Sequence, residues 1–196
     1  MPVHLRTDAP DFEARLADFL ATKRESAPEV DAVVADVIAE VRARGDAALA
    51  ELTAKFDGLD VAPDGLAVTE AEVDAAVHAV PAEDRRALEL AAERIAAYHA
   101  RQRPADADWE DAAGARLGWR WTPVAAAGLY VPGGLASYPS SLLMNAIPAR
   151  EAGVERLVVT MPTPGGAANP LVLLAARLAG VSEIWRVGGA QAIAAL

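Results

Sequence analysis

The first part of the chain places its apolar residues with the period of a helix rather than that of a strand. Phe12, Leu16 and Phe19 follow helical spacing. A second run does the same, through Val30, Val33, Val34, Val37, Ile38 and Val41. Apolar residues three and four positions apart form one stripe along a helix. The pattern therefore predicts two amphipathic helices.

Start and stop signals divide this helical region further. Gly45 interrupts the second run, and Asp46 is expected to cap a helix over 47–56 that stops at Gly58. Two more helices are predicted, over 70–80 behind the capping-box pair Thr69 and Glu72, and over 81–102 behind Pro81. The polar residues 105–113 are interpreted as a loop.

After this loop the pattern changes to short apolar strands that alternate with helices. Residues 115–122 and 124–131 are expected to form a strand pair or hairpin. The order from there is strand 124–131, helix 139–152, strand 156–161, helix 169–179, strand 183–187 and a helix from about 190. Nearly continuous apolar strands are typical of parallel sheets covered on both faces. The sequence thus predicts an α/β protein, with a helical N-terminal region followed by an incomplete Rossmann-like parallel β-α-β-α-β domain.

Charge and glycine content change at the same place as the pattern. Residues 1–112 carry 25 acidic and 12 basic side chains, whereas residues 113–196 carry 3 acidic and 6 basic ones. Eleven of the 14 glycines also follow position 112. We therefore expect a helical region that begins the first α/β domain over 1–112, a connecting strand or linker over 113–123, and a Rossmann-like domain over 124–196.

Composition excludes several functional classes. A net charge of −10 argues against a nucleic-acid or anionic-membrane surface. The chain contains no cysteine, so disulfides, thiolate catalysis and cysteine-based zinc sites are excluded. It also lacks the apolar run of a membrane span and the apolar core of a signal peptide. We expect a soluble cytoplasmic protein.

Two glycine-rich turns are the candidate ligand-binding features. Pro132-Gly133-Gly134 follows the first strand of the parallel series, and Gly188-Gly189 follows the third. Both precede helix N-termini, whose backbone N–H groups favour anions, and both belong to the edge where α/β sheets bind ligands. Neither turn matches a dinucleotide fingerprint or a phosphate-binding loop. Spacing alone leaves a ligand-holding loop and ordinary turn chemistry equally open.

Individual polar side chains near these turns have two interpretations each. Tyr130 could stack on a ligand or be a core aromatic, and Gln191 could bind a ligand or be solvated in the first turn of its helix. Ser140 and Ser141 are expected to cap the helix that starts near 139. His4, His78 and His99 lack the spacing of a helical metal site. These residues could bind something, but the sequence contains no recognisable catalytic base.

Several motifs resemble the histidinol dehydrogenase family along nearly the whole chain. They are Val41-Arg-x-x-Gly-Asp-x-Ala-Leu49, Thr53-x-Lys-Phe-Asp-Gly58, Tyr130-Val-Pro-Gly-Gly134, Pro139-Ser-Ser-x-x-Met-Asn145 and Gly188-Gly-Ala-Gln-Ala-Ile-Ala-Ala-Leu196. The resemblance implies a homodimeric, zinc-dependent enzyme that uses two NAD molecules to oxidise L-histidinol to L-histidine, at the end of histidine biosynthesis. It also implies two incomplete Rossmann-like domains facing each other across the active site.

The resemblance also suggests roles for particular residues. Tyr130 and Gln191 match positions that contact NAD, and the turns containing Pro132, Gly133, Gly134 and Gly189 match the cofactor side, while Ser140 matches a position near the substrate. The family's zinc ligands and its catalytic acid/base residues are expected beyond Leu196. We therefore expect the 196 residues to be an inactive N-terminal part of a longer chain. The alternative is a non-catalytic nucleotide- or anion-binding module that acts through a partner.

Overall fold

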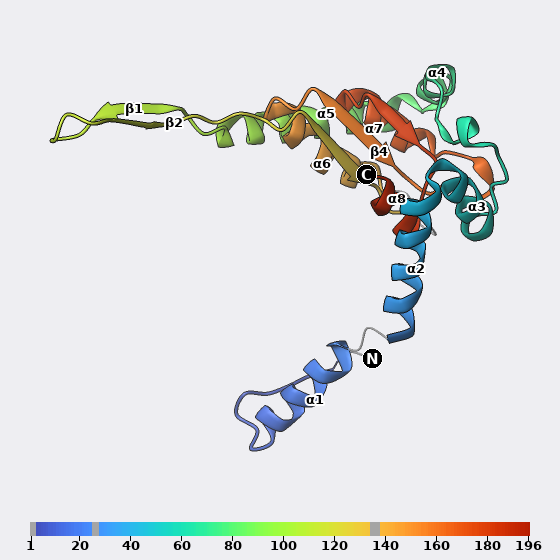
Figure 1. Cartoon of the computed structure of the whole chain (residues 1–196), viewed down its shortest axis with the longest axis horizontal. Helices are drawn as coiled ribbons and strands as arrows, with labels where there is room; N and C mark the ends of the chain where they lie inside the picture. The colour runs from blue at the N-terminus through green and yellow to red at the C-terminus, as the bar shows by residue number, and fades with distance from the viewer. Residues whose placement is uncertain (1–2, 25–27, 134–137) are drawn as a thin grey trace.

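The computed structural model describes residues 3–24, 28–133 and 138–196 (Figure 1). Its α-helices are α1 Phe12–Arg24, α2 Pro28–Arg44, α3 Asp46–Asp57, α4 Glu70–Ala79, α5 Ala82–His99, α6 Pro139–Glu151, α7 Pro170–Ala179 and α8 Gly189–Ala195. Its strands are β1 Ala107–Glu110, β2 Arg116–Trp119, β3 Ala126–Tyr130, β4 Arg156–Thr160 and β5 Glu183–Trp185. Three short 3₁₀ turns are η1 Pro63–Leu66, η2 Ala100–Gln102 and η3 Pro164–Gly166.

The predicted helices are present, and most of their end signals act as expected. Thr69 and Glu72 form both hydrogen bonds of a capping box at the start of α4. Asn169 caps α7 by accepting a hydrogen bond from the Leu171 N–H at 2.8 Å. Asp46, however, is the first residue of α3 and not its cap. Gly45 occupies the cap position with a φ of 57°, a left-handed conformation that favours glycine.

The C-terminal part forms the predicted β-α-β-α-β unit. Strands β3, β4 and β5 are parallel and adjacent in that order, with Gly128 opposite Val158 and Val159 opposite Ile184. Helices α6 and α7 connect them and pack on each other. The three carboxyl ends of the strands therefore lie at one edge of the sheet, where parallel α/β proteins bind ligands.

The two faces of this sheet are covered unequally. Leu157 and Val159 point into a fully apolar core with α6 and α7, and α4 and α5 add a further layer to that side. The opposite face meets Leu49 of α3, Leu66 of η1 and Ala192 of α8. It also keeps a cavity of about 350 Å³ over β3, β4 and β5. The expectation that both faces are covered is thus correct for one face and only partly correct for the other.

The predicted hairpin of 115–122 with 124–131 is wrong. Strand β2 pairs in antiparallel fashion with β1, inside the segment that was interpreted as a loop, and β3 pairs with β4. Asp111 closes the β1–β2 turn by accepting hydrogen bonds from the N–H groups of Ala113 and Ala115, both at 2.9 Å. Trp109 and Trp119 meet across the strands with ring centroids 5.1 Å apart. Figure 1 shows this hairpin projecting from the α/β body.

The helical region and the sheet share one apolar core. Val73 and Ala76 of α4 belong to the same buried cluster as Leu143 of α6 and Leu173 of α7. The division into 1–112, 113–123 and 124–196 remains a prediction about domains. Figure 1 shows α1 lying away from this body. No helix among the described residues has both the length and the apolarity needed to cross a membrane.

A buried arginine joins the helical region to the sheet. Arg186, directly after β5, is 7% exposed, and its Nη1 donates a hydrogen bond to the Ala67 carbonyl at 2.6 Å. Its Nη2 bonds the Glu72 carboxylate, the same group that completes the capping box. Hydrogen bonding to the Thr69 N–H is the main cause that lowers the Glu72 pKa, and the charge of Arg186 adds to it. One carboxylate thus starts α4 and compensates a buried charge.

We expect Glu72→Gln to lower the free energy of unfolding by about 1–2 kcal/mol. The amide can still complete a capping box, but Arg186 would lose its buried negative partner. The Glu72 side chain is 47% exposed, so solvent screening keeps the expected loss at this modest level. Chemical denaturation of the two proteins measures the difference.

Glu70→Gln is the matched control, because Glu70 also lies in the first turn of α4 but pairs with exposed Arg177. Its expected cost is below about 0.5 kcal/mol. The Glu72 pKa is lowered on folding, so its stabilisation is complete above the ordinary value of 4.5 and is lost as pH falls through the lower folded value. The gap between wild type and Glu72→Gln should therefore shrink on acidification below pH 4.5. A gap that is constant with pH, or equal costs for the two variants, would contradict this role.

Candidate functional site

Three loops meet at the carboxyl edge of the sheet. They follow β3, β4 and β5 and include the described residues 131–133, 161–163 and 186–188. Pro162, in the middle loop, lies between the other two. A Cβ atom added to Gly133 would come within 2.5 Å of Pro162 Cγ, and one added to Gly188 would come within 2.6 Å of Pro162 Cβ. Both glycines are therefore required for the close approach of these loops.

The outer loops are also linked through Tyr130. The Gly189 N–H donates a long hydrogen bond of 3.4 Å to the Tyr130 hydroxyl. Gly189 has a φ of 61°, which favours glycine at the first residue of α8. The two turns that the sequence pattern singled out therefore lie side by side.

Gln191 lies beside Gly189, and its side chain is buried. The residue is 2% exposed, in contrast to the expectation of a solvated first-turn side chain. The Gln191 side chain lies over Gly189. A Cβ atom added to Gly189 would lie 2.7 Å from Gln191 Oε1. Together with Asp57 of α3, Gln191 and Gly189 line a cavity of about 220 Å³ between α2, α3 and α8.

The first glycine turn borders a separate groove. Pro132 and Gly133 line a cavity of about 410 Å³ with Tyr138, Met161 and Pro162. Gly134, the remaining residue of the predicted turn, lies outside the described residues. This groove and the Gln191 cavity lie on either side of the contact between the loops, so the edge offers two concave surfaces.

Ser140 and Ser141 do not cap α6. The cap position belongs to Tyr138 and the helix begins at Pro139, so both serines lie inside its first turn. Ser140 is exposed. The expected substrate role of Ser140 remains a prediction.

Three buried oxygens at this edge were missed by sequence reasoning. The hydroxyls of Thr160 and Thr163 and Oδ2 of Asp57 are enclosed and have no hydrogen-bond partner among the described residues. Burial raises the pKa of Asp57. Asp57 Oδ2 would lie 3.2 Å from a Cβ on Gly188, so α3 reaches the second turn. The sequence motif around Asp57 signalled only the end of a helix, because this contact spans distant parts of the chain.

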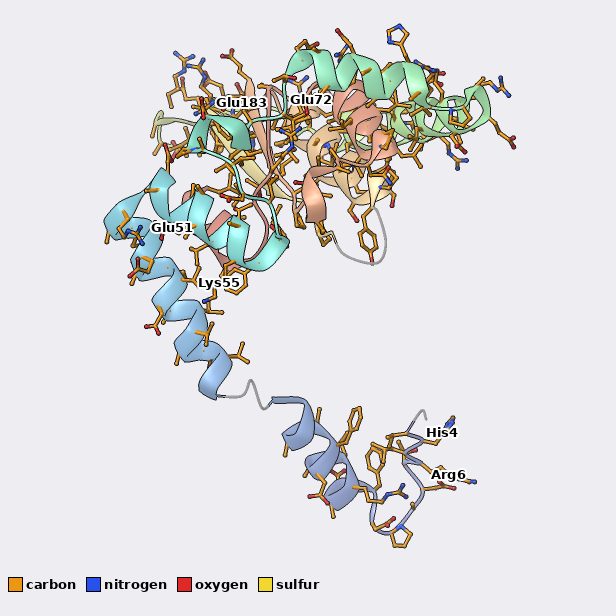
Figure 2. All side chains as sticks on the ribbon, turned by 90° about the vertical axis from the view of Figure 1, so that its right-hand side faces the viewer. His4, Arg6, Glu51, Lys55, Glu72 and Glu183 are labelled. Atoms are coloured by element: carbon orange, nitrogen blue, oxygen red, sulfur yellow. The ribbon has the colours of Figure 1, made fainter. Side chains whose placement is uncertain are left out.

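The described residues provide no metal centre. No group of three histidine, aspartate or glutamate side chains there is arranged to hold an ion. His78 Nδ1 lies 2.7 Å from the Asp74 carbonyl, and His99 Nδ1 lies 2.6 Å from Gln102 Oε1. Figure 2 shows His4 on the α1 arm, away from the α/β body. The residues that the structure describes therefore do not fit a zinc site.

The glycines at this edge let the backbone lie close to Pro162 and to Gln191, where a Cβ atom would clash. The buried hydroxyls beside them have no hydrogen-bond partner among the described residues. Tyr130 adds a partly buried aromatic ring whose hydroxyl already lies at the second turn. Concave surfaces with few polar groups are typical of small-molecule sites.

Comparison with known proteins identifies relatives over the whole chain. The family model described as histidinol dehydrogenase matches residues 20–196. The histidinol dehydrogenases of Cereibacter sphaeroides and Ruegeria pomeroyi are 69% and 63% identical over all 196 residues, which cover 45% of each relative. The chain thus spans about half the length of these curated relatives.

A solved structure supports the same assignment. The crystal structure of histidinol dehydrogenase from Elizabethkingia anophelis superposes with a TM-score of 0.80 at 32% identity, over 85% of this chain and 38% of that one. The parallel sheet and its helices therefore occur in a relative as well. The chain belongs to the histidinol dehydrogenase family.

Proposed function

We propose that this chain is the NAD-binding part of a histidinol dehydrogenase. The observation that carries the proposal is the hydrogen bond between Gly189 N–H and the Tyr130 hydroxyl, which unites both candidate turns at the carboxyl edge of the sheet. Tyr130 and Gln191 would contact the cofactor, and Pro132, Gly133, Gly134 and Gly189 would form the surrounding backbone. Ser140 would lie toward the substrate.

The proposed reaction is the oxidation of L-histidinol to L-histidine, the last steps of histidine biosynthesis. NAD held by Tyr130 and Gln191 would supply the two-electron oxidant for each oxidation, first of the alcohol to the aldehyde and then of the hydrated aldehyde to the acid. In each step the hydroxyl proton would go to a base. This chain's own residues would bind the nicotinamide cofactor and position it.

The described residues provide no zinc site for this reaction. The family resemblance implies a zinc-requiring enzyme, but no cluster of suitable ligands is present here. The ligands and the acid/base residues would come from the part of a family member that this chain does not span.

A homodimer in the cytoplasm is the proposed state of the complete enzyme. Val30 and Val33 on α2 are 56% and 55% exposed, and such apolar residues on one helix are typical of association surfaces. Light scattering on the assembled protein measures its molar mass and hence its oligomeric state. A monomer at all concentrations would contradict the dimer.

Tyr130→Ala should weaken NAD binding about tenfold or more, because stacking on one aromatic ring contributes about 1–3 kcal/mol per base. Calorimetric titration with NAD measures the dissociation constant. Tyr98→Ala is the control, since Tyr98 is a 63% exposed tyrosine on α5 outside the site. Equal binding by the two variants would remove Tyr130 from the cofactor site.

We expect no L-histidinol-dependent NADH formation from these 196 residues alone, with or without added zinc. Mixing the chain with the remainder of the Cereibacter sphaeroides relative, the part that the match does not cover, should restore turnover. NADH absorbance follows both reactions. Turnover by the chain alone would show that it holds a base and a metal site. NAD binding without turnover in a well-assembled mixture would favour the non-catalytic binding module.

A further inference from the structure

The last residue of α3, Asp57, has a carboxylate oxygen that the described chain leaves without a partner. Its Oδ2 is enclosed and accepts no hydrogen bond from the described residues. Burial raises the Asp57 pKa, and no cation of the described chain opposes that shift. A carboxylate accepts several hydrogen bonds, and burying its charge is costly unless it is paired. Asp57 is therefore an acceptor that lacks donors.

The cavity beside Asp57 has an apolar wall and two polar side chains. Val33 and Val37 of α2 and Phe56 of α3 form the wall, and the Asp57 carboxylate and the Gln191 amide are the polar groups. Asp57 is half-buried with Oδ2 enclosed, so a ligand in this cavity would meet its other oxygen, Oδ1. The volume of about 220 Å³ is below the range of about 300–1,000 Å³ that encloses a drug-sized ligand. The cavity therefore suits one part of a dinucleotide.

The other part of a dinucleotide has a place across the loop contact. NAD consists of two nucleotides joined by a pyrophosphate, and the edge offers the Gln191 cavity and the groove lined by Pro132 and Tyr138. Tyr138 is also the cap of α6, the helix whose first turn contains Ser140 on the proposed substrate side. The reacting nicotinamide half belongs on that side. The adenosine half then belongs in the cavity beside Asp57, an assignment that rests on the proposed function.

We propose that Asp57 accepts a hydrogen bond from the 2′-hydroxyl of the adenosine ribose and thereby selects NAD over its 2′-phosphorylated form, NADP. In dinucleotide-binding domains with the glycine fingerprint, an acidic residue of the same domain holds this hydroxyl. Here the carboxylate comes from α3, in the helical region. A phosphate on the same oxygen adds about two negative charges and removes the donor. Beside a carboxylate without a compensating cation, that group is repelled.

Asp57→Asn tests the proposal, because it keeps the size of the side chain and removes its charge. Calorimetric titration of the 196-residue chain measures the dissociation constants of NAD and NADP. We expect the wild type to bind NAD at least about tenfold more tightly than NADP, since only NAD donates to the carboxylate. The variant should bind NAD about three- to tenfold more weakly and NADP more tightly, so that the preference falls about tenfold or more.

Asp60→Asn is the matched control. It removes the same charge from an exposed aspartate just beyond α3 that does not line the cavity. Both dissociation constants should stay within about twofold of the wild-type values. Thermal unfolding of the free chains should show Asp57→Asn to be at least as stable as the wild type, because the variant no longer buries an unpaired charge.

The titrations distinguish this inference from the proposed function. No NAD binding by the wild type would contradict the proposed function itself. Wild-type NAD binding with an unchanged preference in Asp57→Asn would overturn the role of Asp57 alone. Equal weakening of NAD and NADP would mean that Asp57 only holds the backbone near Gly188.

Smaller ligands test which half of the cofactor Asp57 contacts. ADP-ribose retains the adenosine half and lacks nicotinamide, so its binding should weaken in Asp57→Asn by the same factor as that of NAD. Nicotinamide mononucleotide lacks the adenosine half and should bind both proteins equally. The reverse result would place the carboxylate on the nicotinamide ribose and overturn the proposal. Nicotinamide hypoxanthine dinucleotide, which lacks the adenine amine, should follow NAD, and insensitivity to the variant would assign the contact to that amine instead.

Discussion

The burial of Arg186 fixes how the two parts of this chain fit together. A guanidinium that is 7% exposed needs compensation, and it finds it in the Ala67 carbonyl and the Glu72 carboxylate, both from the helical region. The backbone N–H of the same residue holds the Leu66 carbonyl. Arg186 thus bonds the carboxylate that caps α4 and helps to hold the 66–68 segment along the outer edge of β5.

The close packing of the loops explains why glycines are required at the candidate site although the sequence has no dinucleotide fingerprint. The loops after β3 and β5 approach the loop after β4 so closely that Gly133 and Gly188 leave no room for a Cβ beside Pro162. In the usual fingerprint, the glycines bring backbone to a pyrophosphate. Here the structure shows them bringing loop to loop, and the concave surfaces lie on either side of that contact.

Local signals predicted most of the elements, while contacts between distant segments decided the rest. The capping box at Thr69 and the cap at Asn169 involve neighbouring residues, so their helices could be predicted from the sequence. Strand β1 was missed because Ala-Asp-Trp-Glu alternates over only four residues inside a polar stretch, and its pairing depends on Trp119 across the hairpin. The burial of Gln191 and the approach of Asp57 to Gly188 follow from the packing of α2 and α3 on α8, which no short motif encodes.

The carboxyl edge contains buried polar oxygens, from Thr160, Thr163 and Asp57. Each buries an oxygen without a partner among the described residues, and each such atom costs about 1–3 kcal/mol if it stays unpaired. Thr53 of α3, four residues before Asp57, buries a fourth oxygen of this kind. Groups that donate hydrogen bonds to the oxygens at the carboxyl edge would remove this cost there. This cost is the physical support for the proposal that the carboxyl edge recognises a ligand.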